Sequence, residues 1–159
     1  MSRLIRWLVA LIVGVAAVLV APQAVAGAPV LDGVTLRYLP PGLGGSTDFS
    51  YEYDDVQFTA RVWESGSDTD GWSVDLDVDV MRGARLTSAR ALHDWFVAYE
   101  ERPPSETNYR PVRVRGHRGW MGRDEIFWLV RPGLAVAVTL DRTRWRQHQL
   151  IRTAWGVRA

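Results

Sequence analysis

The sequence predicts an α+β fold, in which a mainly antiparallel sheet of about six strands carries two helices, in the order βββαβββα. Three observations lead to this prediction. Segments in which apolar and polar residues alternate follow one another through short turns, which is typical of antiparallel strands. Two segments with apolar residues at helical spacing separate and close these strand groups. Strand runs joined by short turns favour an antiparallel sheet over a doubly wound one.

Residues 1–26 have the layout of a secretory signal peptide. Arg3 and Arg6 precede a run of 15 apolar or glycine residues, Trp7 to Ala21, and the segment ends in Ala24-Val25-Ala26. We expect cleavage after the last of these alanines and a secreted, extracytoplasmic protein. The alternative is an uncleaved N-terminal membrane anchor, because the apolar run approaches the roughly 20 residues that span a bilayer.

The rest of the chain is predicted to be a short tail, residues 27–33, followed by a single α+β domain, residues 34–159. Alternation predicts a first strand at 34–38, followed by a proline- and glycine-rich loop at 40–45. The alternation between 49 and 62 changes parity at Asp54-Asp55, which indicates a bulge or a tight turn.

A polar turn at 65–71 leads into a strand at 72–80, which we expect to bury one face. Thr87 or Ser88 can cap a helix that runs to about Glu101, before Pro103-Pro104.

The second half of the domain is predicted to repeat the order of three strands and a helix. The strands are expected at 112–115, 125–131 and 134–140, with a hairpin turn at Arg131-Pro132-Gly133. A final helix is expected from about Arg144 to Val157.

Several short motifs in this chain resemble those of small exported proteins of actinobacteria, most of which are uncharacterised. The motifs are Leu36–Leu43, Val62-Trp63, Val80–Gly83 and the closing Leu150-x-x-x-Ala154-x-x-Val157. The second half, from Val112 to Val157, resembles an extracytoplasmic domain of unknown function that also occurs on anti-sigma-factor-type membrane proteins. The resemblance implies a cell-envelope location and supplies no catalytic residues.

Charge is divided unevenly along the chain. Residues 32–101 hold 14 acids and 5 arginines, a net of −9, whereas residues 102–159 hold 4 acids and 12 arginines, a net of +8. Either the two halves neutralise each other in one sheet, or the basic half presents a surface to anionic envelope material. Under the second interpretation, Arg142, Arg144, Arg146 and Trp145 are the predicted binding residues. Their partners would be an anionic envelope polymer, lipid headgroups or another envelope protein, and not nucleic acid.

Three carboxylates, Asp75, Asp77 and Asp79, alternate along one predicted strand. Like charges in a row repel, so we expect cations opposite them. The expected partners are Arg61 on the preceding strand and, on a later strand, Arg113 and Arg115. With Asp124 and Glu125, the same carboxylates are the candidates for an alternative function as a carboxylate-dependent hydrolase, which would need two of them within about 10 Å at a cleft.

Other chemistry-bearing residues give weaker signals. Trp63, Trp120 and Trp145 could line a groove, although tryptophan is more often buried in a core. The three histidines, His93, His117 and His148, are predicted on the surface because they lack metal-ligand spacing.

The aspartates around Gly71 are interpreted as a polar turn, because a calcium loop would need a side-chain oxygen where Gly66 stands. The chain has no cysteine, which excludes disulfides and thiolate metal sites. We expect no cofactor and no metal. The sequence thus predicts a non-enzymatic binding or sensory domain of the cell envelope, with the hydrolase as the alternative.

Overall fold

The computed structural model describes residues 29–103 and 107–159, and its central element is a seven-stranded antiparallel sheet. The strand order is β3-β4-β5-β9-β8-β7-β6. The strands of this sheet are β3 (Gly45–Tyr53), β4 (Val56–Ser67), β5 (Gly71–Arg82), β6 (Arg110–Val114), β7 (His117–Met121), β8 (Glu125–Arg131) and β9 (Leu134–Leu140). A second sheet contains β1 (Val30–Leu31), β2 (Val34–Leu36) and β10 (Val157–Arg158), and the helices are α1 (Ala89–Glu100) and α2 (Gln147–Gly156).

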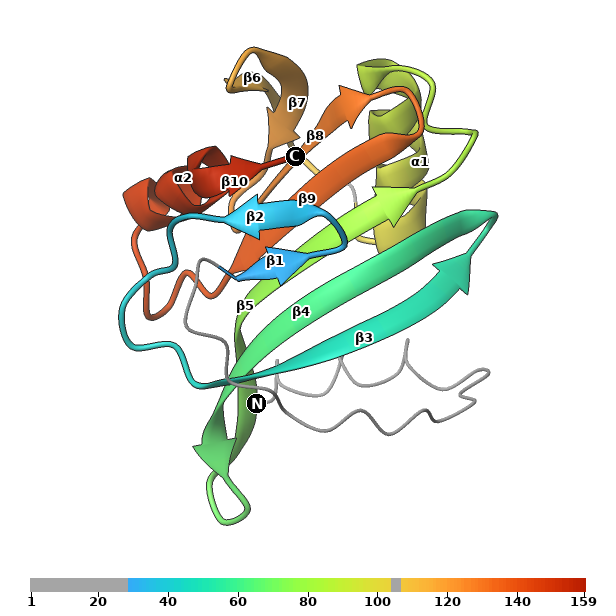
Figure 1. The fold of residues 1–159 in the computed structure, drawn as a ribbon. Coiled ribbons are helices and arrows are strands. Elements are labelled where there is room, and N and C mark those ends of the chain that lie inside the picture. Colours follow the sequence, from blue (N-terminus) through green and yellow to red (C-terminus); the bar gives the residue numbers. More distant parts are fainter. Residues whose placement is uncertain (1–28, 104–106) are drawn as a thin grey trace.

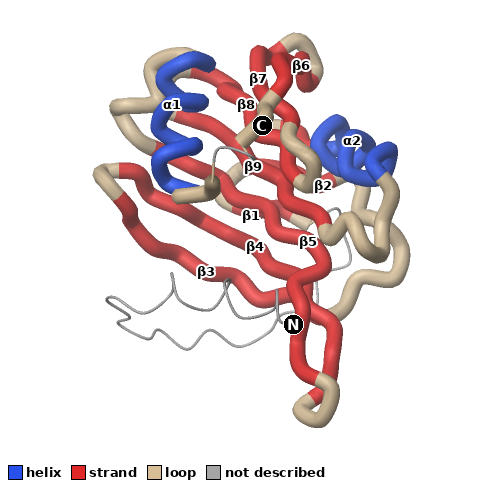
Figure 2. The backbone as a smooth tube through the Cα atoms, turned by 180° about the vertical axis from the view of Figure 1, so that it is seen from behind, coloured by secondary structure: helices blue, strands red, loops and turns tan. Residues whose placement is uncertain are grey.

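The large sheet lies between two covering layers. The small sheet and α2 lie on one face, in front of it in Figure 1, and α1 lies on the other face, in front in Figure 2. Each layer has its own apolar core: Leu76 and Val78 pack with Leu150 of α2, whereas Phe58 and Phe127 pack with α1. We call these the α2 face and the α1 face of the sheet. The α+β class and the mainly antiparallel sheet are therefore confirmed.

The number of strands differs from the prediction: the described residues form ten strands in two sheets, not about six in one. Three of the additional strands gave weak alternation signals. β1 and β10 have two residues each, and β7, His117-Arg118-Gly119-Trp120-Met121, does not alternate apolar with polar residues. Leu31, predicted to lie in a short tail, belongs to β1, and its side chain is buried in the core between the two sheets. The predicted loop at 40–45 is also one residue too long, because Gly45 already pairs with Glu64.

The tight turns were placed correctly by the sequence pattern. Asp54 and Asp55 form the two-residue turn between β3 and β4, with φ of 51° and 60°. Positive φ at both central residues is the geometry that follows the twist of a hairpin, and aspartate tolerates it better than most residues. Pro132-Gly133 closes the hairpin of β8 and β9, with φ of 82° at the glycine.

The two helices begin differently from each other. Ser88 caps α1, since its side chain accepts a hydrogen bond from the Ala91 backbone N–H at 3.1 Å, as predicted. The final helix was predicted about three residues too long at its start, because α2 begins at Gln147. Arg144 therefore precedes the helix, and Arg146 is its N-cap.

The signal-peptide prediction concerns residues 1–26, which lie outside the described residues. Among those that are described, no helix is long and apolar enough to cross a membrane.

Candidate functional site

The four residues predicted to bind an anionic partner lie close together but have different environments. Arg144 forms an ion pair with Asp75, whose side chain is fully buried. The guanidinium carbon of Arg144 lies over the ring of Trp145, 4.4 Å from the ring centroid. Arg142 Nη1 donates to the Trp145 carbonyl at 2.7 Å. Arg146 is exposed at the start of α2. The prediction that these residues bind an anionic polymer stays a prediction.

Asp75 is a structural anchor on the α2 face. A register shift between Trp63 and Glu64 turns its side chain away from the row that it would share with the other two aspartates. It accepts hydrogen bonds from the Gly44 N–H at 2.9 Å and from Ser65 Oγ at 2.7 Å, in addition to Arg144. The Arg144–Asp75 pair joins the basic half of the chain to the acidic half, as the interpretation of mutual neutralisation requires.

We expect Arg144→Ala to lower the free energy of unfolding by about 2 kcal/mol. Loss of one partner of a buried pair costs about 3–5 kcal/mol, but the arginine side chain is 42% exposed, so solvent screening reduces the effect. Urea titration at low salt measures the loss. The matched control is Arg146→Ala, which removes an exposed charge two residues away and should cost below about 0.5 kcal/mol. Equal effects of the two changes would contradict this role of Arg144.

The expected partners of the three aspartates are wrong. Asp79 pairs across the strands with Ala60 and Asp77 with Val62, whereas Arg61 lies opposite Val78. The register differs by three residues from the expected one, which set Arg61 opposite Asp75, and a shift by an odd number puts Arg61 on the other face of the sheet. Arg61 points to the α2 face, where it binds Asp48 at 2.6 Å.

Arg113 and Arg115 do not lie opposite these acids either. β6 lies at the far edge of the sheet, with β7, β8 and β9 between it and β5, and Arg113 donates to the Gly116 carbonyl at 2.9 Å.

Asp77, Asp79 and Glu125 instead gather on the α1 face, near the C-terminal end of α1. Asp77 and Glu125 both pair with Thr139 of β9, one from each side. Glu100, the last residue of α1, raises the pKa of all three carboxyls by its charge. We call Asp77, Asp79, Glu100 and Glu125 the carboxylate cluster.

Arg102 forms ion pairs with the acids on one side of the carboxylate cluster, Glu100 and Glu125. Its Nε lies 2.7 Å from Glu100 and its Nη1 lies 3.5 Å from Glu125 and 3.1 Å from Asp124. The Tyr109 hydroxyl also donates to Glu125. Burial still dominates at Glu125 and, together with Glu100, raises the pKa of this carboxyl to about 7.

The other side of the cluster has unpaired oxygens. The Oδ1 atoms of Asp77 and Asp79 are buried and have no hydrogen-bond partner among the described residues. Burial, followed by the charge of Glu100, raises the pKa of Asp77 to about 7. Burial raises the pKa of Asp79 well above its usual range, and the charges of Asp77, Glu100 and Glu125 add to this. Buried polar atoms are normally paired, so these two oxygens mark an unusual place in the fold.

Tyrosines border the same place. The hydroxyls of Tyr51 on β3 and Tyr99 on α1 lie 2.9 Å apart, and burial raises the pKa of Tyr99 to about 12, with further contributions from Asp79. Tyr51 stacks on Phe58 at 4.6 Å, yet it remains 40% exposed. The carboxylate cluster is thus bordered by aromatic side chains, and Asp77 and Asp79 are half-buried, so part of each side chain still reaches solvent.

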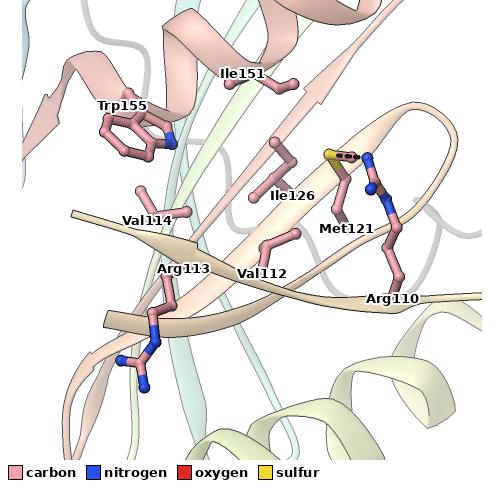
Figure 3. Close-up of a pocket in the computed structure, with 8 residues that line it drawn as sticks. All are labelled: Arg110, Val112, Arg113, Val114, Met121, Ile126, Ile151 and Trp155. Carbon is pink, nitrogen blue, oxygen red and sulfur yellow. Dashed lines mark hydrogen bonds between the residues drawn. The ribbon is translucent and has the colours of Figure 1, made fainter. Parts of the chain in front are cut away.

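A second candidate site is an apolar groove on the α2 face (Figure 3). It has a volume of about 240 Å³ and lies between the β6–β7 hairpin and α2. Side chains of Val112, Val114 and Ile126 form its apolar surface together with those of α2, where Trp155 is 52% exposed. Arg110 stands at the Met121 end of the groove, whereas Arg113 points away from the apolar side chains.

A basic pocket of about 200 Å³ adjoins the groove. Its polar lining includes Arg115, His117 and Arg158. Arg115 follows Val114 of the groove directly, and Trp128 of the pocket lies two residues from Ile126 on the same face of β8, so the two hollows are neighbours.

Sequence patterns located the carboxylate cluster and the apolar groove only in part. Asp77, Asp79, Asp124 and Glu125 were candidates, but Glu100, Arg102 and the three tyrosines were not, because residues far apart in the chain converge there. The tryptophans differ from the prediction of a groove: Trp63 and Trp145 are buried, Trp120 is half-buried, and the tryptophan that lines a groove is Trp155. His93, predicted on the surface, is half-buried, with its ring 4.4 Å from that of Trp120.

Comparison of the chain with family models, curated proteins and solved structures gave no match. The resemblance to small exported actinobacterial proteins therefore rests on the motifs quoted above.

Proposed function

We propose that this protein is a non-enzymatic binding domain of the bacterial cell envelope that holds an anionic amphiphile. The apolar tail of the ligand would occupy the groove between the β6–β7 hairpin and α2. Its anionic headgroup would contact Arg115 and Arg158 in the adjoining basic pocket. The observation that carries the proposal is the juxtaposition of an open apolar groove and an arginine-lined pocket on one face.

The dimensions of the groove favour a partly inserted tail. A volume of about 240 Å³ corresponds to roughly eight water molecules, which is small for a whole lipid. Burying apolar area gives about 25 cal/mol per Å², so a short stretch of chain against Trp155 and Ile151 contributes affinity while the headgroup fixes orientation. The net charge of +8 in residues 102–159 adds attraction for an anion.

The lining of the groove also favours binding over hydrolysis. It contains arginines and apolar side chains but no carboxylate, and a groove of this kind offers no general acid or base. Of the carboxylates that the hydrolase alternative would use, Asp77, Asp79 and Glu125 lie on the other face of the sheet. The remaining two, Asp75 and Asp124, are ion-paired with Arg144 and Arg102 and do not line the groove. The extracytoplasmic location that makes a lipid ligand available is supported by the signal-like pattern of residues 1–26.

Titration with short-chain lipids tests this function. We expect a lysophosphatidylglycerol to change the fluorescence of Trp155 at concentrations where the zwitterionic lysophosphatidylcholine of equal chain length does not. Arg115→Gln with Arg158→Gln should weaken binding of the anionic lipid roughly tenfold or more, since each arginine near an anionic surface contributes about 1 kcal/mol.

The control for charge is Arg90→Gln with Arg131→Gln, which removes two exposed arginines elsewhere and should leave the affinity unchanged. Val112→Phe, which fills the groove, should weaken both lipids. Equal affinity for the two headgroups, or an unchanged affinity in the groove-filling variant, would refute the proposal.

A further inference from the structure

We propose that the carboxylate cluster is a second binding site, for an organic cation that carries a primary ammonium or guanidinium group. This site lies on the α1 face and is independent of the lipid groove. Its central residues are Asp77 and Asp79 of β5, whose buried Oδ1 atoms have no hydrogen-bond partner within the described residues.

The sequence of the neighbouring strands leaves Asp79 with small neighbours. Across the sheet, it lies between Ala60 of β4 and Ala137 of β9, and the next residues outward in the same row are Phe49 and Phe127. Paired Cβ atoms in a sheet lie about 5 Å apart, so methyl side chains cover less of a carboxylate than larger ones would, and Asp79 is half-buried although its Oδ1 atom is buried. The row therefore places a carboxylate between two short side chains, with an aromatic ring at each end.

Negative charge exceeds positive charge around these aspartates, because the arginines nearby are paired with other acids. Arg102, at the far side of the cluster, contacts Glu100, Asp124 and Glu125. The ion pairs that the structure gives for Arg61 and Arg144 are with acids of the α2 face. A cation that approaches Asp77 and Asp79 would meet two carboxylates, each with one oxygen that lacks a hydrogen-bond donor within the described residues. Each donor that the cation supplies would satisfy one of these oxygens.

The chemistry of the surroundings favours an organic cation over a metal ion. In the described part of the chain, no three acidic or histidine side chains converge as metal ligands. The exposed rings of Phe49 and Tyr51 lie on the same sheet face as the aspartates, 43% and 40% exposed. Ammonium and guanidinium groups are attracted both to carboxylates and to aromatic faces, whereas small metal ions require several oxygen ligands at short distance.

Binding of a cation at this place is coupled to proton release. The raised pKa values of Asp77 and Asp79 mean that part of the cluster holds protons near neutral pH, and a bound cation would displace them. The affinity should therefore rise between pH 5 and pH 8. The groups that act on the two aspartates directly are Glu100, Glu125, Tyr51 and Tyr99. Arg102 and Tyr109 contribute to this dependence through Glu100 and Glu125.

Isothermal titration at pH 8 with spermidine, with an Ala-Arg-Ala peptide and with CaCl₂ tests the proposal. We expect at least one of the two organic probes to bind, and calcium to bind more weakly than that probe. Binding of spermidine alone would assign the site to a free polyamine, and binding of the peptide alone to a basic side chain of a partner. Asp77→Asn with Asp79→Asn should weaken binding roughly tenfold or more, which is the contribution of one or two charge-assisted hydrogen bonds.

The matched control is Asp68→Asn with Asp70→Asn, which removes the same charge from the exposed turn between β4 and β5 and should leave the affinity unchanged. Circular dichroism checks that both double variants fold, and each single substitution, Asp77→Asn or Asp79→Asn, should show a smaller loss. Three results would overturn the proposal: no binding of either organic probe at pH 8, equal weakening in both double variants, or an affinity that falls as pH rises from 5 to 8.

Discussion

The free energy of unfolding is expected to fall by about 3 kcal/mol or more as pH rises from 5 to 8. The pKa values of Asp77 and Glu125 rise to about 7 on folding, and that of Asp79 rises further. An acid with a raised pKa binds more protons in the folded state than in the unfolded one, so stability is highest at acidic pH and is lost as pH passes through the folded pKa. One pKa unit corresponds to about 1.4 kcal/mol for each group, and coupling among the three reduces their sum.

Urea titrations at pH 5, 6, 7 and 8 measure this profile. Asp77→Asn with Asp79→Asn should flatten it and make the variant more stable than the natural protein at pH 8, because two buried charges are removed without a change of shape. Asp94→Asn is the control, since this carboxylate is 62% exposed on α1 and should leave the slope as it is. A profile that rises from pH 5 to 8 would contradict the burial of the carboxylate cluster.

The parts of the fold that could be predicted are those with local signals. The hairpin turns at Asp54-Asp55 and Pro132-Gly133, the N-cap Ser88 and the strands β8 and β9 depend on residues adjacent in the chain, and their patterns were sufficient. The class of the fold followed from the order of these elements.

Register and pairing across the sheet could not be predicted in the same way. A bulge between Trp63 and Glu64 shifts β4 against β5, so Asp75 faces Arg144 while Asp77 and Asp79 face α1. A shift of one residue exchanges the two faces of a strand, and the alternation of β5 alone is equally consistent with either register. The expected pairing with Arg61 was wrong for this reason.

The face of β5 that carries Asp77 and Asp79 was expected to be solvated, and this expectation failed because a helix from further along the chain packs on that face. A strand that alternates aspartate with valine normally has one solvated face, and that was the expectation for β5. Here α1 packs on the same face, Tyr99 lies near the aspartates, and both aspartates are partly buried instead of solvated. Nothing in the local pattern of residues 72–80 distinguishes a solvated acidic face from a covered one, because the covering helix lies further along the chain.

The second large effect is expected for Leu76→Ala in the centre of β5, which should cost 2–5 kcal/mol of unfolding free energy, the range for a buried leucine. Leu76 is fully buried, and its cross-strand neighbours on either side are Trp63 of β4 and Leu140 of β9. Both neighbours belong to strands held by ladders of hydrogen bonds, so the walls of the new cavity cannot close in on it, which places the loss in the upper half of the range.

Val74→Ala is the matched control for Leu76→Ala. It lies two residues away on the same strand but is 47% exposed, and it should cost below about 1 kcal/mol. The comparison separates loss of packing from loss of strand propensity, which both substitutions share. Urea titration at pH 6 measures both variants. A loss below about 0.5 kcal/mol for Leu76→Ala, or equal losses for the two, would mean that β5 does not lie between β4 and β9 with this side chain facing α2, because only that register buries Leu76 and exposes Val74.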